Sequence, residues 1–286
     1  NSSAYGRNSQ ALADEASAFG RNSCATGECS TAVGYYSCAT GLHSNAFGRN
    51  SCATGTYSQA FGSMSKALSG HATALGYTAC ANASRATSVG WSTHASTGHA
   101  TAMGYASCAS ACGATAIGRS SCATGDCSAS FGFYACSMSA CSTALGYYAV
   151  TSGNQALAIG KGSLASGDYS TSIGHGTCAT GVRSTSLGRC ACATAEGATA
   201  IGHCVAATAA CALVLGGCCV GIGTSAPRGL LDIVDNTAAG GNPDTLTLQS
   251  TYNATGDGPS IRFAEDNPAH TVNWTLARII AREETS

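Results

Sequence analysis

One feature constrains this chain more than any other. A glycine recurs every 14 residues, sixteen times without a slip, from Gly6 to Gly216. The residue before each of these repeat glycines is apolar, beginning with Tyr5 and ending with Leu215. A fixed period of this kind indicates a repeat architecture, in which each unit packs on its neighbours instead of around one central core.

Each repeat contains two similar halves, roughly Ser-x-Ala-x-Gly followed by two further residues, as in SCATG at 23–27. Small residues alternate with other residues, which is the period of a β-strand. Each half predicts a five-residue strand and a two-residue turn, so two strands make one coil. The fold prediction is therefore all-β: a parallel β-roll, or solenoid, of 14-residue coils about 4.8 Å apart and roughly 70 Å long.

In so short a coil the two sheets lie close together, so inward side chains must be small. Ser23, Ala25 and Gly27 are predicted to point inward, and Cys24 and Thr26 outward. On the other strand the apolar residue before each glycine faces outward, which leaves a continuous apolar stripe. Because a large exposed apolar patch is an aggregation hazard, we expect three identical rolls to bury their stripes along a common axis. The predicted trimer interface consists of Phe19, Val33, Phe47, Phe61, Leu75, Val89, Met103, Ile117, Phe131, Leu145, Ile159, Ile173, Leu187, Ile201 and Leu215.

Composition excludes several classes of protein. Only 9% of the 286 residues are charged and the formal net charge is −1, so nothing predicts binding to nucleic acid. The chain has no run of about 20 apolar residues, and we expect no membrane insertion. The 44% apolar content argues against disorder. Asn1 falls inside a repeat and no signal peptide precedes it, so we expect a piece of a longer protein.

The repeat units resemble a known family. Units such as STAVGYYSCATGLHSNAFGRNSCATG (30–55) and HATALGYTACANASRATSVG (71–90) are similar to the head repeats of YadA-type trimeric autotransporter adhesins, over about residues 1–216. The resemblance implies a left-handed parallel β-roll assembled as a homotrimer. The eighteen cysteines of this chain depart from the usual heads, which carry few.

The composition changes after the last repeat glycine, where all four prolines lie. The segments VGIGTSAPRGLLDI (220–233) and NWTLARIIAREETS (273–286) resemble parts of phage tail fibres and tailspikes. We therefore divide the chain into a roll, residues 1–219, and a smaller β-rich module, residues 220–286, that continues the shaft. No heptad pattern indicates the coiled-coil stalk expected after a bacterial adhesin head, which favours a viral fibre.

The position directly after the repeat glycine carries planar and cationic side chains on many coils. Aromatic rings and guanidinium groups in one row can stack on sugar rings or pair with acidic glycans. The alternative is that they stack across the subunit interface, where such groups are also common. The candidate receptor-binding residues are Arg21, Tyr35, Arg49, Tyr77, Trp91, Tyr105, Arg119, Phe133 and Tyr147.

Nine cysteines share the position four residues after the repeat glycine. Stacked neighbours would have Cα atoms about 4.8 Å apart, a separation that disulfide bonds allow. Runs of three leave one cysteine unpaired, and Val150 and Leu164 occupy the same position, so reduced cysteines remain an alternative. The candidate disulfide-forming residues are Cys24, Cys38, Cys52, Cys108, Cys122, Cys136, Cys178 and Cys192. The spacings match no four-ligand zinc site, so we predict no metal and no cofactor.

These patterns predict an adhesive fibre without enzymatic activity, since no close pair of carboxylates recurs for acid–base chemistry. The preferred function is that of a phage tail or head fibre segment on the virion surface. Its expected partners are a host receptor, most simply a glycan, and other fibre or virion proteins. The first alternative is the head of a bacterial trimeric autotransporter adhesin at the cell surface. The second is an ice-binding or purely structural solenoid, suggested by rows of threonine such as Thr26, Thr40 and Thr54.

Overall fold

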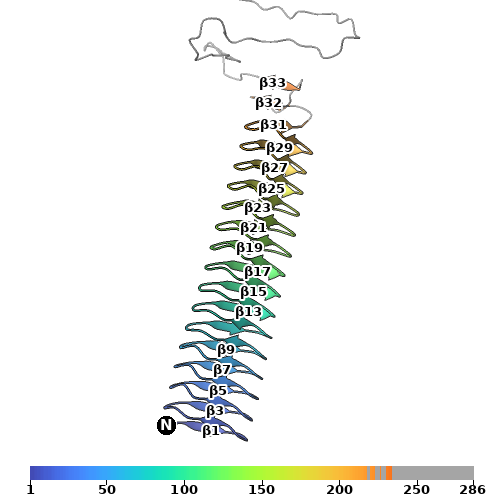
Figure 1. Cartoon of the computed structure of the whole chain (residues 1–286). Helices are drawn as coiled ribbons and strands as arrows, with labels where there is room; N and C mark the ends of the chain where they lie inside the picture. The colour runs from blue at the N-terminus through green and yellow to red at the C-terminus, as the bar shows by residue number, and fades with distance from the viewer. Residues whose placement is uncertain (218–219, 223–225, 227–229, 234–286) are drawn as a thin grey trace, which may run out of the picture. The chain divides into compact units, whose positions relative to one another are not determined.

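The computed structural model describes residues 1–217, 220–222, 226 and 230–233. The chain divides into two units, Asn1–Cys218 and Cys219–Ser286. The first unit is a regular stack of coils built from two long parallel sheets (Figure 1). Every regular element among the described residues is a β-strand. No helix in this part of the chain is long and apolar enough to cross a membrane.

Sheet 1 contains the odd-numbered strands, each of which ends within one residue of a repeat glycine. Its sixteen strands are β1 (Ser3–Tyr5), β3 (Ser17–Phe19), β5 (Thr31–Val33), β7 (Asn45–Phe47), β9 (Gln59–Phe61), β11 (Thr73–Leu75), β13 (Thr87–Trp91), β15 (Thr101–Tyr105), β17 (Thr115–Arg119), β19 (Ala129–Phe131), β21 (Thr143–Leu145), β23 (Leu157–Ile159), β25 (Thr171–His175), β27 (Thr185–Arg189), β29 (Thr199–His203) and β31 (Leu213–Gly216).

Sheet 2 contains the even-numbered strands, which begin four residues after the repeat glycine. Its fifteen strands are β2 (Gln10–Ala11), β4 (Cys24–Ala25), β6 (Cys38–Ala39), β8 (Cys52–Ala53), β10 (Lys66–Ala67), β12 (Cys80–Ala81), β14 (His94–Ala95), β16 (Cys108–Ala109), β18 (Cys122–Ala123), β20 (Cys136–Ser137), β22 (Val150–Thr151), β24 (Leu164–Ala165), β26 (Cys178–Ala179), β28 (Cys192–Ala193) and β30 (Ala206–Ala207).

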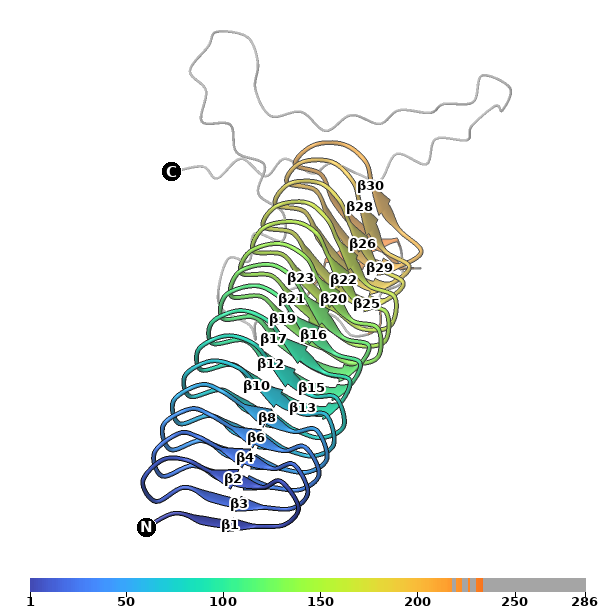
Figure 2. The ribbon, with the colours of Figure 1, turned by 60° about the horizontal axis from the view of Figure 1, so that its bottom comes forward.

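The register of both sheets follows the sequence period. Each strand pairs in parallel with the strand 14 residues further on, as in Val89↔Met103 and Gly90↔Gly104 of sheet 1 and Ala109↔Ala123 of sheet 2. Figure 2 shows the successive coils stacked along the roll. The predicted parallel β-roll of 14-residue coils is therefore confirmed. Its hand and its trimeric state stay predictions.

The core between the two sheets contains only small side chains. Alanines and serines alternate along each strand with solvent-facing residues, as Ser23, Ala25 and Ala32 show with no exposed surface. The largest fully buried side chains are the three threonines Thr93, Thr151 and Thr177. This confirms the predicted inward and outward assignment of the repeat positions. Since alanine and serine bury little apolar area, the backbone hydrogen bonds between coils carry a large share of the cohesion.

The strands are shorter than predicted. Those of sheet 1 span three to five residues and those of sheet 2 only two, whereas each half-repeat predicts five. The reason is that every coil makes two left-handed turns, which end the extended backbone early. Asn22, with φ 56°, and Cys29, with φ 53°, are the left-handed residues of one coil.

These left-handed turns recur at non-glycine residues in almost every coil. The conformation costs a residue with a side chain roughly 1–2 kcal/mol. It persists because the turn backbones also bond to the neighbouring coil: the amide of Asn22 donates to the carbonyl of Arg7 at 2.9 Å, and that of Cys29 to Asp14 at 2.9 Å. The ladder of backbone hydrogen bonds thus continues around the turns.

The repeat glycine is required by both conformation and space. Gly104 has φ 122°, a region that side chains rarely adopt, and a Cβ there would overlap the carbonyl oxygen of Gly118 in the next coil. Every coil places the same glycine over the same neighbour. The fixed recurrence of glycine therefore reflects close approach between successive coils as well as backbone freedom.

In the second unit the structure describes two short strands, β32 (Val220–Ile222) and β33 (Leu231–Ile233), which pair in parallel. Residues 234–286, including the segment 273–286 that resembles a tail fibre, lie outside the described residues. The proposed division into a roll of residues 1–219 and a module of residues 220–286 accordingly stays a prediction.

A glycine substitution tests this packing. We expect Gly104→Ala to lower the free energy of unfolding by at least about 2 kcal/mol, because it adds backbone strain and a clash with Gly118. Gly98→Ala is the matched control, since a Cβ there meets only the carbonyl oxygen of Ser84 at 3.9 Å. Urea unfolding followed by circular dichroism measures both. Equal stability of the two variants would contradict the close approach of the coils.

Candidate functional site

Stacking turns the outward side chains of the roll into four continuous surfaces. The apolar stripe consists of the residues before the repeat glycines, starting at Tyr5 on sheet 1. The basic–aromatic edge consists of the first and second residues after them, starting at Arg7. The thiol row consists of the residues four positions after them, starting at Gln10 on sheet 2. The acidic edge consists of the residues eight and nine positions after them, starting at Asp14.

The apolar stripe contains every predicted trimer-interface residue, in register from Phe19 to Leu215. Aromatic members stack on one another, with ring centroids 5.1 Å apart for Phe47 and Phe61. Much of the stripe is exposed in the single chain, as in Leu75 with 48% of its surface accessible. Its role in oligomerisation stays a prediction.

The nine candidate receptor-binding residues lie in one row of the basic–aromatic edge. Trp91 stacks between two tyrosines, with its ring centroid 4.5 Å from that of Tyr77 and 6.2 Å from that of Tyr105. The guanidinium of Arg119 lies 5.5 Å from the ring centroid of Tyr105 and 5.2 Å from that of Phe133. The structure thus joins these residues into a continuous stack of rings and one cation.

The remaining candidates extend this row at both ends. Arg21 covers the ring of Tyr35, with its guanidinium carbon 4.4 Å from the centroid. The rings of Phe133 and Tyr147 stack at 5.2 Å. Arg49 lies in the same row, but among the described residues it makes no contact with an aromatic ring. Whether the row binds a receptor stays a prediction.

A second aromatic row on the same edge was not predicted. Tyr36, Tyr134 and Tyr148 occupy the left-handed position two residues after the glycine. The ring centroids of Tyr134 and Tyr148 lie 5.0 Å apart, and each ring also packs edge-on against the first row, at 4.6 Å from Phe133 and Tyr147 respectively. The signal was present in the sequence, because the same 14-residue period relates these tyrosines.

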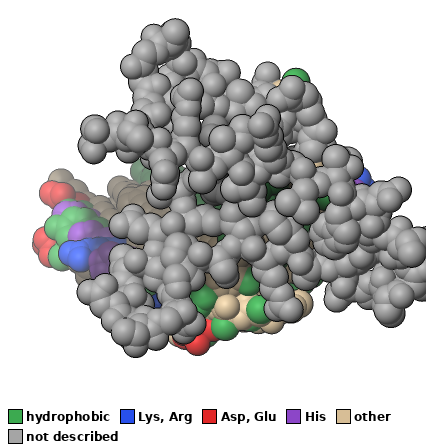
Figure 3. Space-filling view, turned by 90° about the horizontal axis from the view of Figure 1, so that it is seen from above, with side chains coloured by type: hydrophobic (Ala, Val, Ile, Leu, Met, Phe, Trp, Pro, Cys, Tyr) green, Lys and Arg blue, Asp and Glu red, His purple; other side chains and the backbone are tan. Residues whose placement is uncertain are grey.

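Charge is separated between the two edges of the roll. Six of the nine basic residues in positions 1–216 directly follow a repeat glycine: Arg7, Arg21, Arg49, Arg119, Lys161 and Arg189. All six acidic residues of that range lie on the opposite edge: Asp14, Glu15, Glu28, Asp126, Asp168 and Glu196. The acidic edge also carries Arg85 and Arg183, and Figure 3 shows acidic, basic and histidine side chains together at one side of the roll. Within residues 1–216, no acidic side chain lies on the basic–aromatic edge to compete with an anionic ligand for its cations.

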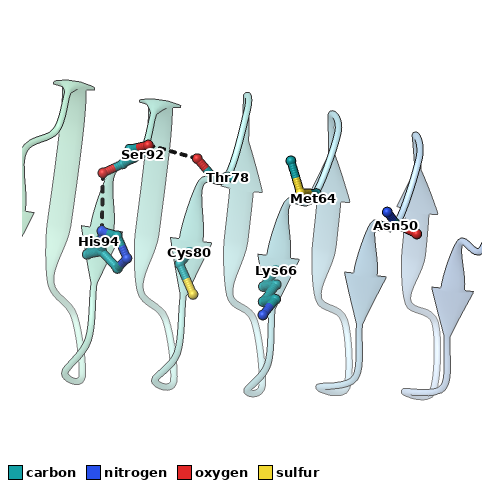
Figure 4. A pocket seen from close by; sticks show the side chains of 7 residues that line it. All are labelled: Asn50, Met64, Lys66, Thr78, Cys80, Ser92 and His94. Carbon is teal, nitrogen blue, oxygen red and sulfur yellow. Dashed lines mark hydrogen bonds between the residues drawn. The ribbon is translucent and has the colours of Figure 1, made fainter.

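A shallow groove of about 510 Å³ runs between the second row of the basic–aromatic edge and the thiol row. Figure 4 shows its two sides, with Lys66, Cys80 and His94 along one and Asn50 along the other. The carbonyl oxygen of Ser92 lies 3.1 Å from Nδ1 of His94, which links the two sides of the groove. The hydroxyl of Ser92 lies 2.9 Å from that of Thr78, on the same side. The remaining lining residue is Met64.

The eight cysteines predicted as candidates for disulfide bonds lie in register on sheet 2, and the structure has all eight as free thiols. Whether these thiols pair in an oxidising environment stays a prediction. Parallel in-register neighbours keep their Cβ atoms at the sheet spacing of about 4.8 Å, beyond the 3.5–4.5 Å that a disulfide prefers.

Hydrogen bonds connect neighbouring thiols and shift their pKa values unequally. The Cys38 thiol donates to Cys52, which lowers the pKa of Cys52 to about 7 against the opposing effect of burial, with a smaller contribution from the positive charge of Lys66. In the run formed by Cys108, Cys122 and Cys136, a hydrogen bond from Cys122 lowers the pKa of Cys136 to about 7. The two runs of three cysteines therefore each end in a thiol that is easily deprotonated.

Alkylation tests this assignment. We expect Cys52 to react with iodoacetamide with a rate that rises as pH rises through about 7, since only the thiolate attacks. In Cys38→Ala the hydrogen-bond donor is lost, so the midpoint should move up toward the ordinary value of about 8.5. Peptide mass spectrometry of labelled protein measures the rate, with Cys178→Ala as the control that leaves it unchanged. An unchanged midpoint in Cys38→Ala would contradict the hydrogen bond.

Comparison with known proteins identifies the class of the roll. The sequence model of the YadA head domain repeat matches residues 1–23, 25–51, 53–79, 142–163, 152–177, 165–191 and 179–203. Parts of the roll thus match YadA head repeats, as the sequence resemblance predicted. No curated protein matches the chain.

One solved structure matches part of this chain. It is the crystal structure of the collagen-binding domain of the Yersinia adhesin YadA, which is 23% identical to this chain. The match covers 61% of this chain and 69% of that one, with a TM-score of 0.23. Collagen binding is a property of that domain. The predicted resemblance of the C-terminal segment to phage tail fibres has no counterpart in these comparisons.

Proposed function

We propose that this chain is a head segment of a trimeric adhesin, which presents its roll as an elongated binding surface outside a cell. The matches to YadA head repeats support an adhesin at the cell surface over a phage tail fibre. The residues that suggested a tail fibre lie largely outside the described part of the chain. The observation that carries the proposal is that the apolar stripe and the basic–aromatic edge both run along the length of the roll.

The apolar stripe supports the trimer. It runs over all sixteen strands of sheet 1, and burying the exposed part of each large side chain would contribute about 1 kcal/mol. Summed along the roll, this is of the same order as the cost of association, about 4–15 kcal/mol, so a stripe of this length is needed to hold the copies together. A straight stripe also suits a closed assembly around one axis, in which each copy contributes the same surface.

Charge substitutions in the stripe test the trimer. We expect the triple variant Phe47→Asp, Phe61→Asp, Leu75→Asp to dissociate, since three copies would bring nine carboxylates together on the axis. Light scattering on the size-exclusion peak should give three chains for the unaltered protein and one for the variant.

The control places the same charges on the opposite sheet. Leu12, Leu68 and Met138 are exposed on the sheet 2 side, Leu68 with 40% of its surface accessible. The triple variant Leu12→Asp, Leu68→Asp, Met138→Asp should remain trimeric. A monomeric unaltered protein, or dissociation of both variants alike, would contradict the proposed interface.

The basic–aromatic edge is the proposed ligand surface, and an acidic glycan is the proposed ligand. Stacked rings provide flat apolar faces for sugar rings, and interleaved guanidinium groups provide bidentate donors for carboxylate or sulfate groups. The acidic residues lie on the other edge, so they oppose binding little. Repetition along the roll lets one polymeric ligand contact several coils at once, which raises affinity beyond that of a single site.

Matched variants on the two edges test this ligand surface. We expect Arg119→Ala, Phe133→Ala, Tyr147→Ala to weaken binding to an immobilised sulfated glycan by about 10-fold or more, since each lost cation–π or stacking contact is worth about 0.5–1 kcal/mol. Arg183→Ala, Tyr169→Ala removes the equivalent pair on the acidic edge, where the guanidinium lies 6.0 Å from the ring centroid. This control should bind normally.

The same assay uses surfaces coated with collagen and with a neutral glycan as comparators. Binding to the sulfated glycan that survives the triple variant would remove the ligand proposal. It would leave the trimer proposal intact, because the two rest on different faces of the roll. Preferential binding to collagen would likewise contradict the glycan as ligand.

A further inference from the structure

The thiol row forms a site that neither the adhesin proposal nor the comparisons assign. It contains three uninterrupted runs on sheet 2: Cys24, Cys38 and Cys52; Cys108, Cys122 and Cys136; and Cys178 with Cys192. The thiols within each run are free and half-buried, and each lies close enough to its neighbour to shift that neighbour's pKa. Such a row of sulfur atoms offers several thiolate ligands in one line.

The spacing of the row determines whether a disulfide bond or a metal ion can join two neighbouring sulfur atoms. In-register neighbours stand about 4.8 Å apart with their side chains parallel. A zinc–thiolate bond is about 2.3 Å long, and two metal–sulfur bonds of about that length placed in line span about 4.6 Å, close to the spacing of the coils. A linear, two-coordinate ion therefore fits where a disulfide would have to draw the Cβ atoms together.

The arrangement also excludes the commoner metal sites. Zinc and iron–sulfur centres need about four ligands around one point, whereas a flat sheet offers ligands in a single line. Within the described residues no group of three or more His, Cys, Asp or Glu side chains converges on one point. Soft ions with a low coordination number remain, and thiolates are the ligands that select them.

We propose that the cysteine runs of sheet 2 bind soft monovalent ions of the Cu(I) and Ag(I) type, each held between the thiolates of two adjacent coils. Two thiols bind one ion and release two protons, so each occupied pair changes from neutral to a net charge of −1. Binding strengthens as pH rises, because protons are products. Cys52 lies next to Lys66, whose ammonium offsets this charge at the end of the first run.

The row stays accessible in the proposed assembly. The apolar stripe belongs to sheet 1 and the thiol row to sheet 2, on the opposite side of the roll. Burying the stripe in a trimer would therefore leave the thiols facing outward. The site rests on the fold alone and does not depend on the adhesin function.

Silver titration of the full chain tests the proposal. Reduced protein is mixed anaerobically with Ag(I) in an excess of a competing monothiol, which removes ions held by a single sulfur. Native mass spectrometry then counts bound ions per chain, and X-ray absorption counts sulfur neighbours per ion. We expect at least one ion for each of the three runs and two sulfur neighbours for each ion.

Three alanine variants locate the ions, and alanine already occupies this row at Ala206. Cys38→Ala leaves Cys24 and Cys52 two coils apart, so it should lose every ion of the first run. Cys24→Ala keeps the adjacent pair Cys38 and Cys52 and should retain one. Cys80→Ala removes a thiol whose neighbours are Lys66 and His94, and should retain all.

Several outcomes would overturn the site. The unaltered protein could hold no ion against the monothiol, or the three variants could lose equal numbers of ions. Three or four sulfur neighbours per ion would also contradict linear coordination. Circular dichroism of each variant shows whether it is folded, so that loss of an ion can be told apart from unfolding. None of these outcomes bears on the adhesin proposal, which the trimer and glycan assays test separately.

Discussion

Backbone stacking in register at a 14-residue period is the constraint on which the rest of this structure depends. Backbone amides donate to carbonyl oxygens of the neighbouring coil at a fixed offset, around the turns as well as along the strands. The core adds little, because alanine and serine bury little apolar surface. Stability therefore comes from interfaces between neighbouring coils, as in other solenoids.

The same constraint converts single residues into surfaces. A residue type favoured at one repeat position becomes a row about 4.8 Å in pitch along the roll. Large apolar residues form a stripe, arginines and aromatics form an edge, and cysteines form a line of sulfur atoms. Function on such a scaffold depends on rows with a fixed pitch, and a ligand that shares the pitch or extends along it is recognised many times over.

Much of this architecture can be predicted from the sequence. The glycine period gives the coil length, and the alternation of small residues gives the inward positions, such as Ala25 and Ala32, correctly. The strand lengths were wrong because the left-handed turns at residues such as Asn22 and Cys29 carry no consistent residue type. Asparagine, tyrosine, histidine and cysteine all occupy those positions, so composition does not reveal them.

The chemistry of the site was less predictable. The sequence places Arg49 and Arg119 in the same row, yet of these two only Arg119 stacks on rings. Tyr105 and Phe133 flank Arg119, whereas Arg49 lies between Ser63 and Tyr35, whose ring Arg21 already covers. The second tyrosine row and the separation of charge appear only when the repeat positions are compared one by one. The pKa of Cys52 depends on which thiol donates the hydrogen bond, a choice that spacing alone does not determine.

Thermal unfolding of two deletion variants tests the stacking most directly. Deleting residues 105–118 removes one complete coil and joins Gly104 to Arg119 in register. Deleting only residues 105–114 leaves the chain no return path from β15 to β17. The account predicts one cooperative transition close to that of the unaltered protein for the first variant, and a split or much lower transition for the second. If both deletions were tolerated equally, a roll built on a 14-residue register would be contradicted.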